Sequence, residues 1–128
     1  NTARRAHILV VDDEVALLNA YRRFFRTSHV LETAEGGAHA LEILEKCSDF
    51  DLIVCDLMMP TMDGPALFDI VAERWPELSR RMVFSSGAAM SQRVQSFGAR
   101  AEVQCVAKPI PRGDLERLLL QMEKLRCL

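Results

Sequence analysis

The feature that most constrains the fold is the alternation of short apolar runs with amphipathic segments. The five runs lie at 7–11 (HILVV), 29–34 (HVLETA), 51–55 (DLIVC), 81–84 (RMVF) and 102–107 (EVQCVA). Several are almost continuously apolar and β-branched, which is typical of strands buried on both faces of a sheet. With 128 residues, the chain is long enough for one domain with its own core. We therefore expect a single domain that spans residues 1–128.

Helical periodicity fills the segments between these runs. Apolar residues recur every three or four positions from Val15 to Phe25, Ala38 to Leu44, Leu67 to Val71, Met90 to Phe97 and Leu115 to Leu125. Trp75 and Pro76 end the third pattern, and Gly98 ends the fourth. Strand and helix thus alternate five times, which favours an α/β fold with a doubly wound, five-stranded parallel sheet. Right-handed crossovers place helices on both faces of such a sheet.

Composition excludes several classes of protein. The formal net charge is −2, so no basic field favours nucleic-acid binding. The apolar runs are far shorter than the roughly 20 residues that span a bilayer, and the chain opens with no signal-peptide pattern. None of the four cysteines belongs to a CxxC pair, and we expect Cys55 and Cys105 to be small buried residues. This cysteine usage predicts a reducing, cytoplasmic setting, and the short apolar runs predict no membrane contact.

Polar residues collect where the predicted strands end. They are Asp12, Asp13, Asp56, Ser85, Ser86 and Lys108. The carboxyl ends of parallel strands lie along one edge of a sheet, where ligands of open α/β folds bind. Three carboxylates close together repel one another, which raises at least one pKa, and Mg²⁺ relieves such repulsion. Three negative charges balance one lysine and one dication, and the balanced site suits a phosphoryl group attacked by a carboxylate.

Each of these residues also has an alternative interpretation. Asp12 or Asp13 suits the N-cap of the following helix, and Asp56 is equally a cap or a functional group. Ser86 before Gly87 is typical of a turn, and Lys108 of a solvated loop. Only their joint position at the ends of four strands favours function.

The motifs at these positions resemble the receiver domain of two-component response regulators over essentially the whole chain. VVDDE resembles the acidic pair of that family, and CDLMMPTMDG its phosphorylation loop. FSSG resembles the conserved hydroxyl position, and AKPI the lysine–proline pair. The resemblance implies the flavodoxin-like strand order 2-1-3-4-5.

The resemblance also implies a metal site. Asp13, Asp56 and the backbone carbonyl of Met58 would bind Mg²⁺, and Asp12 would help to hold the ion. Pro60 and Gly64 would shape the loop that turns this carbonyl toward it.

The same resemblance implies a phosphorylation site. Asp56 would be the phosphoacceptor, and Lys108 would contact the phosphoryl oxygens. The family spacing of thirty residues from phosphoacceptor to hydroxyl selects Ser86 rather than Ser85. The Lys108–Pro109 bond would be cis.

One position departs from the family pattern. An aromatic residue usually stands three places before the lysine and turns inward when the hydroxyl moves toward the phosphate. This chain has Cys105 there, which is too small for that role. Phosphorylation would then act on the surface of the fourth helix, fifth strand and fifth helix through Ser86 alone. In the alternative interpretation, Cys105 is simply packed in the core.

The sequence therefore predicts a phosphoacceptor domain that turns over no external substrate. A histidine kinase or a histidine phosphotransfer protein would donate the phosphoryl group, and a homodimer is possible. FSSGAAM and CVAKPI most resemble receivers attached to hybrid histidine kinases, which favours a domain taken from a longer chain. One alternative is an interaction module with the receiver fold that phosphorylation does not control. A second, an aspartyl-phosphate phosphohydrolase, is disfavoured because Met58 stands where its acid/base carboxylate would be.

Overall fold

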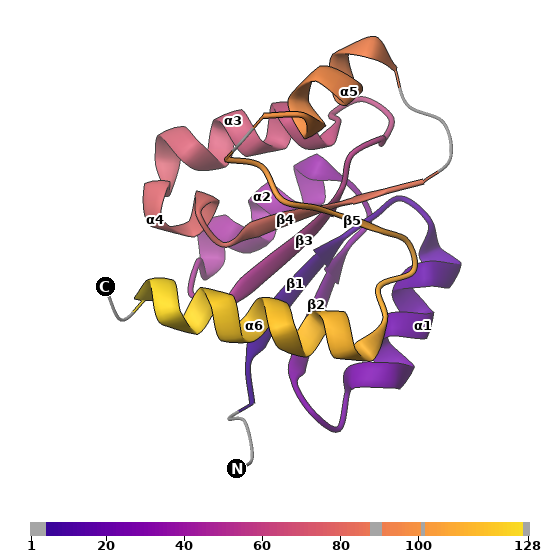
Figure 1. Ribbon diagram of the computed structural model, residues 1–128, viewed down its shortest axis with the longest axis vertical. Helices are drawn as coiled ribbons and strands as arrows, with labels where there is room; N and C mark the ends of the chain where they lie inside the picture. Colours follow the sequence, from indigo (N-terminus) through magenta and orange to yellow (C-terminus); the bar gives the residue numbers. More distant parts are fainter. Residues whose placement is uncertain (1–4, 88–90, 101, 127–128) are drawn as a thin grey trace.

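A five-stranded parallel sheet forms the centre of the molecule (Figure 1). The computed structural model describes residues 5–87, 91–100 and 102–126. The strands are β1 (His7–Val11), β2 (Val30–Ala34), β3 (Leu52–Asp56), β4 (Met82–Ser86) and β5 (Cys105–Ala107). Their order is β2-β1-β3-β4-β5 and each neighbouring pair is parallel, which confirms the predicted doubly wound sheet and its strand order.

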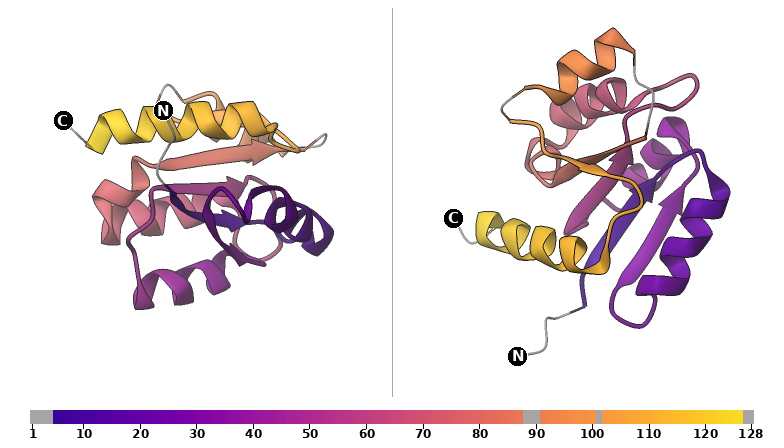
Figure 2. Two further views of the ribbon diagram at one scale, coloured as in Figure 1. Left: turned by 90° about the horizontal axis from the view of Figure 1, so that it is seen from below. Right: turned by 45° about the vertical axis from the view of Figure 1, so that its right-hand side comes forward.

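Helices cover both faces of this sheet. They are α1 (Val15–Phe25), α2 (Gly37–Lys46), α3 (Gly64–Arg74), α4 (Pro76–Ser79), α5 (Gln92–Gly98) and α6 (Arg112–Arg126). The apolar sides of α1 and α6 pack in one core, and those of α2, α3, α4 and α5 pack in a second core across the sheet. Figure 2 shows α6 on one side of the strands and α2 and α3 on the other. This arrangement leaves the carboxyl ends of the strands free of helices.

The three central strands have the burial that their sequences predict. All five residues of β3 are buried, and so are four of the five in β1 and in β4. The edge strands β2 and β5 are partly exposed, because each has a neighbour on only one side. The carboxyl edge of the sheet is therefore formed mainly by its most buried strands.

Several predicted boundaries were wrong, most of all at β5. The run 102–107 forms a strand only from Cys105 to Ala107. Before it, the Val103 amide donates to the Arg100 carbonyl at 3.1 Å, and the Arg100 guanidinium pairs with the exposed Glu102. The chain therefore turns at this point instead of extending as a strand, and the charged pair lies at the surface.

The helical patterns were right in place, with two differences. The short helix α4 was not predicted, since Pro76 was taken only as the end of the preceding helix, whereas it also occupies the first turn of a new one. Met90 lies outside the described residues, so the fourth pattern is seen only through Val94 and Phe97, which are both buried.

Candidate functional site at the carboxyl edge of the sheet

Asp56 is the last residue of the fully buried strand β3. Its Cα pairs in register with Ser85 of β4, and only 3% of the residue is exposed. The Met58 amide donates to its Oδ1 at 3.4 Å, a long hydrogen bond that offers little compensation for a buried charge. Asp56 therefore needs a cationic neighbour.

The other two acids follow β1. Asp12 is buried and Asp13 is exposed. One carboxylate oxygen from each, together with one from Asp56, lies within 4.8 Å of the others. The three acids that the sequence placed at one sheet edge thus form a single cluster.

Helix capping does not explain the buried Asp12 carboxylate. Glu14, not Asp12 or Asp13, is the N-cap of α1, and it makes no side-chain capping bond. The Asp12 Oδ1 atom accepts the Glu14 amide at 2.9 Å, while its Oδ2 atom faces Lys108. The prediction that Asp12 or Asp13 is the N-cap of α1 was therefore wrong, because the helix begins one residue later, after Glu14.

Lys108 forms ion pairs with two of these carboxylates at once. Its Nζ atom lies 3.2 Å from Asp12 Oδ2 and 3.2 Å from Asp56 Oδ2. Lys108 is thus not a solvated loop lysine. The Lys108–Pro109 bond is cis, as the resemblance implied.

The local electrostatics follow from this crowding. Burial raises the pKa of Asp56, the nearby Asp12 raises it further, and Lys108 opposes both. Burial lowers the pKa of Lys108, but attraction to Asp56 and Asp12 outweighs burial, so this pKa lies above its ordinary value. The predicted repulsion among the acids is therefore present, and Lys108 remains a cation.

A tight loop connects Asp56 to α3. A Cβ atom at Gly64 would lie 2.9 Å from the Asp56 carbonyl oxygen and 3.0 Å from Leu57 Cα, so only glycine fits. Thr61 has a φ of 70°, which is uncommon for a β-branched residue. The close approach at Gly64 places the start of α3 against the end of β3. That Pro60 and Gly64 turn the Met58 carbonyl toward an ion stays a prediction.

Ser86 lies beside Lys108 at the end of β4. Its carbonyl accepts the Lys108 amide at 3.2 Å. A Cβ atom at Gly87 would lie 3.7 Å from the Lys108 side chain. The predicted hydroxyl residue therefore ends β4, and the predicted lysine directly follows β5, the strand that pairs with β4. Ser85, by contrast, is buried.

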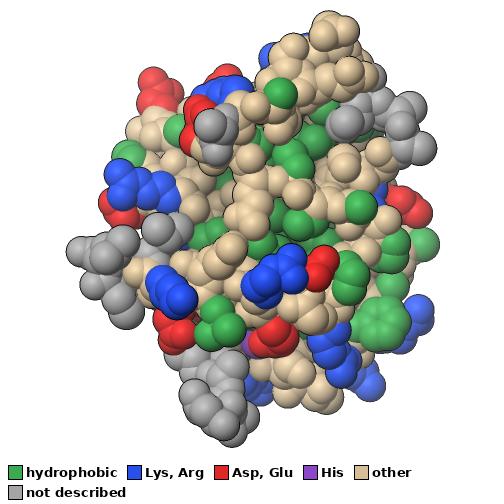
Figure 3. All heavy atoms as spheres, viewed as in Figure 1, with side chains coloured by type: hydrophobic (Ala, Val, Ile, Leu, Met, Phe, Trp, Pro, Cys, Tyr) green, Lys and Arg blue, Asp and Glu red, His purple; other side chains and the backbone are tan. Residues whose placement is uncertain are grey.

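Cys105 is exposed, so its placement in the core was wrong. Its side chain faces α5, because a Cβ atom at Gly98 would lie 3.5 Å from Cys105 Sγ. Figure 3 shows hydrophobic side chains gathered between α5 and α6 on this face. Cys55, in contrast, is fully buried as predicted.

Sequence reasoning missed one functional contact of the loop. Asp63 caps α3 by accepting the Ala66 amide at 3.0 Å, and both its oxygens accept bonds of 3.1 Å from Arg93 of α5. An aspartate directly before Gly64 and Pro65 is an N-cap signal that could have been found. The partner thirty residues later has no such signal.

The acidic cluster fits a divalent cation. Three carboxylates and one lysine sum to a charge of −2, which a dication balances. Oxygen ligands of this kind are those that Mg²⁺ prefers. Asp12, Asp13 and Asp56 are the residues that could hold it.

Comparisons with known proteins identify the family to which the chain belongs. The sequence model of the response regulator receiver domain matches residues 8–120. The sensor kinase CckA of Brucella abortus is 29% identical over 119 residues, which cover 91% of this chain and 12% of that protein. The two-component response regulator ORR3 of Oryza sativa subsp. indica is 27% identical over 113 residues, covering 88% of this chain and 86% of that protein.

Solved structures agree on the fold. A response regulator receiver domain protein from Clostridium thermocellum superposes with a TM-score of 0.80 at 18% identity, over 94% of this chain and 96% of that one. A CheY-like receiver domain from Methanospirillum hungatei superposes with a TM-score of 0.78 at 24% identity, over 94% of this chain and 98% of that one.

In the described ranges, every helix is too short or too polar to cross a bilayer.

Proposed function

Because the chain belongs to the response regulator receiver domain family, we propose that it is a phosphoacceptor domain of a two-component phosphorelay, with Asp56 as the acceptor. The observation that carries the proposal is the buried Asp56 at a strand end, 3.2 Å from a lysine that also holds Asp12. A lysine that pairs with two buried carboxylates is in a position to bind the oxygens of an incoming phosphoryl group as well.

The proposed reaction is the transfer of a phosphoryl group from a phosphohistidine. An oxygen of Asp56 attacks the phosphorus, a P–O bond forms, and the P–N bond breaks as the electron pair returns to the imidazole. Lys108 then stays beside the phosphoryl oxygens as they move onto Asp56, where its fixed charge stabilises them. Ser86 offers its hydroxyl to the same oxygens. Hydrolysis of the acyl phosphate resets the domain.

Asp12, Asp13, Asp56 and the backbone carbonyl of Met58 are the groups that would hold Mg²⁺. When bound, the ion supplies positive charge that neutralises the phosphoryl oxygens and the acidic cluster. The raised pKa of Asp56 supports this assignment, because it marks a carboxylate with too little cationic compensation in the protein alone.

Phosphorylation would act as a switch. The acyl phosphate carries about −2 where the carboxylate carried −1. Movement of Ser86 toward the new charge would shift the surface formed by α5, β5 and α6, which is the predicted output surface. Cys105 lies on that surface, and its small side chain means that no ring on β5 takes part.

The donor that we propose is a histidine kinase or a histidine phosphotransfer protein. One relative is a sensor kinase by name, and the chain spans only 12% of its length. This supports a receiver domain, residues 1–128, that belongs to a longer cytoplasmic kinase. A homodimer stays a prediction.

Intact-mass measurement after incubation with acetyl phosphate and Mg²⁺ tests the function. We expect wild type to gain the mass of one phosphoryl group, and Asp56→Asn or EDTA-treated protein to gain none. The alternative, an interaction module that phosphorylation does not control, requires that wild type stay unmodified by both acetyl phosphate and a phosphorylated histidine donor.

A further inference from the structure

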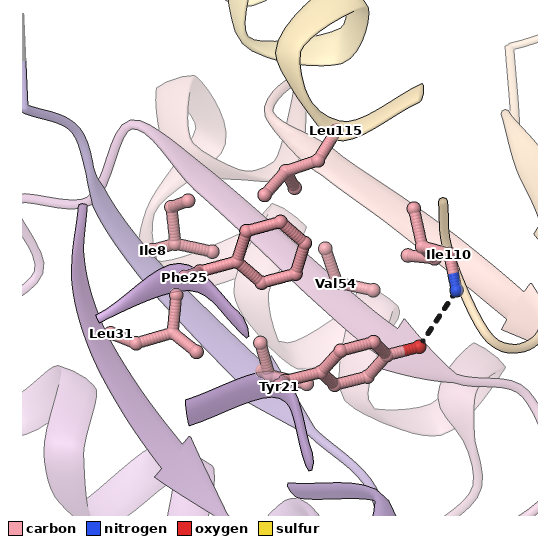
Figure 4. A pocket seen from close by; sticks show the side chains of 8 residues that line it. Ile8, Tyr21, Phe25, Leu31, Val54, Ile110 and Leu115 are labelled. Atoms are coloured by element: carbon pink, nitrogen blue, oxygen red, sulfur yellow. Dashed lines mark hydrogen bonds between the residues drawn. The ribbon is translucent and has the colours of Figure 1, made fainter. Parts of the chain in front are cut away.

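A tyrosine beneath the acidic site touches the loop that carries Lys108 (Figure 4). Tyr21 comes from the inner side of α1, and only 5% of it is exposed. Its ring lies with Phe25 and Leu115 around an apolar cavity of about 10 Å³. The hydroxyl is the polar end of an otherwise apolar pocket and points toward Ile110.

The Tyr21 hydroxyl accepts the backbone N–H of Ile110 at 3.0 Å. Ile110 is itself buried, with 6% exposed. A buried backbone N–H needs an acceptor, and here a side chain from a helix 89 residues earlier in the chain supplies it. Since Pro109 has no N–H, the amide of Ile110 is the first backbone donor after Lys108.

Lys108 is therefore held between two anchors. On one side its own amide donates to the Ser86 carbonyl at 3.2 Å. On the other side the Ile110 amide donates to Tyr21. Between these bonds, the Nζ atom reaches two carboxylates at 3.2 Å each. A shift of the loop at Ile110 would change both distances from the Lys108 Nζ atom to the carboxylates.

The hydroxyl remains a neutral acceptor at this position. Burial raises the pKa of Tyr21, and the charges of Asp12 and Asp56 also raise it, while the Ile110 amide and Lys108 oppose them.

We propose that Tyr21 is a positioning residue for phosphoryl transfer: through the Ile110 amide it fixes the loop that holds Lys108 against Asp12 and Asp56. This inference rests on the proposed function, because it concerns the same lysine. It adds a residue of α1 that belongs to none of the motifs in the sequence.

The test is a double-mutant cycle on the rate of phosphorylation by acetyl phosphate with saturating Mg²⁺. Tyr21→Phe keeps the ring in its pocket and removes only the acceptor, and Lys108→Met removes the charge. We expect Tyr21→Phe to slow wild type by roughly tenfold, a modest misplacement of a catalytic group. In the Lys108→Met background, Tyr21→Phe should leave the rate unchanged.

Phe25→Leu is the matched control, because Phe25 lines the same pocket and makes no bond to Ile110. Phe25→Leu should lower the thermal stability of the domain. Its effect on the phosphorylation rate should be the same with Lys108 and with Lys108→Met. Equal effects of Tyr21→Phe with and without Lys108, or no effect in either background, would overturn the positioning role. A wild type that is never modified would instead overturn the proposed function, together with the premise of this inference.

Discussion

At the scale of single residues, the site is defined by the cost of a buried carboxylate. Asp56 is almost fully buried, and the partners of its charge are Lys108 at 3.2 Å and the Met58 amide in a long hydrogen bond of 3.4 Å. A buried carboxylate without full compensation destabilises the fold, so its presence here indicates that the charge serves a function other than stability.

The raised pKa of Asp56 predicts a pH dependence of stability. The folded pKa lies above the unfolded value of about 3.9, because burial first and Asp12 second favour the protonated form. The stability that this group contributes is complete below the unfolded pKa and is lost as pH rises through the folded pKa. In EDTA at pH 7, Asp56→Asn should therefore have a higher Tm than wild type.

Thermal unfolding of both proteins between pH 4 and pH 8 measures this effect. The gap in Tm should narrow as the pH falls. An Asp56→Asn protein that is less stable than wild type at pH 7 would mean that Lys108 compensates the charge fully.

Gly64 gives a second prediction at this scale. Gly64→Ala would place a Cβ atom 2.9 Å from a backbone oxygen that cannot move without breaking the end of β3. We expect a loss of about 1–3 kcal/mol in the free energy of unfolding, typical of overpacking. Gly113→Ala is the control, since nothing lies within 4 Å of a Cβ atom there. Urea unfolding should show Gly113→Ala to be neutral or slightly stabilising.

At the scale of elements, the pair between Asp63 and Arg93 joins the phosphorylation loop to α5. Arg93 is 58% exposed, so the ion pair itself should contribute less than about 1 kcal/mol. Asp63 also caps α3, and loss of a cap costs about 1 kcal/mol more. In urea unfolding, Asp63→Ala should therefore be more destabilising than Arg93→Ala. The reverse order would show that the pair, not the cap, holds this loop.

Elements also show what the sequence could predict. β1, β3 and β4 were found because strands buried on both faces need continuous apolar runs, as in Leu52–Asp56. β5 was overextended because Glu102 and Gln104 lie in an apolar run but at a partly exposed edge, where pairing ends early. The helix α4 is only four residues long, too short for a periodic pattern.

At the scale of the whole molecule, the fold brings together residues that are far apart in the chain. Asp12, Asp56 and Lys108 could be predicted, since parallel strands end at one edge and each residue carries a recognisable charge. Tyr21 and Arg93 could not. Their roles depend on which atom of α1 or α5 meets which loop, and side-chain packing rather than periodicity decides this.

Metal binding should stabilise the whole domain. A cation that binds only the folded state at ten times its Kd adds about 1.4 kcal/mol of stability by mass action. We expect Mg²⁺ to raise the Tm of wild type in a concentration-dependent manner, and to have little effect on Asp13→Asn. Equal shifts in both proteins would place the ion elsewhere.

The most direct measurement is the chemical location of the phosphoryl group. Wild type labelled with acetyl phosphate and Mg²⁺ is reduced with borohydride, which converts an aspartyl phosphate to homoserine, and is then digested for peptide mass spectrometry. We predict homoserine at position 56 and at no other aspartate. Unreduced Asp56 with homoserine at position 12 or 13, or a fully labelled Asp56→Asn protein, would contradict the assignment of Asp56 as the phosphoacceptor.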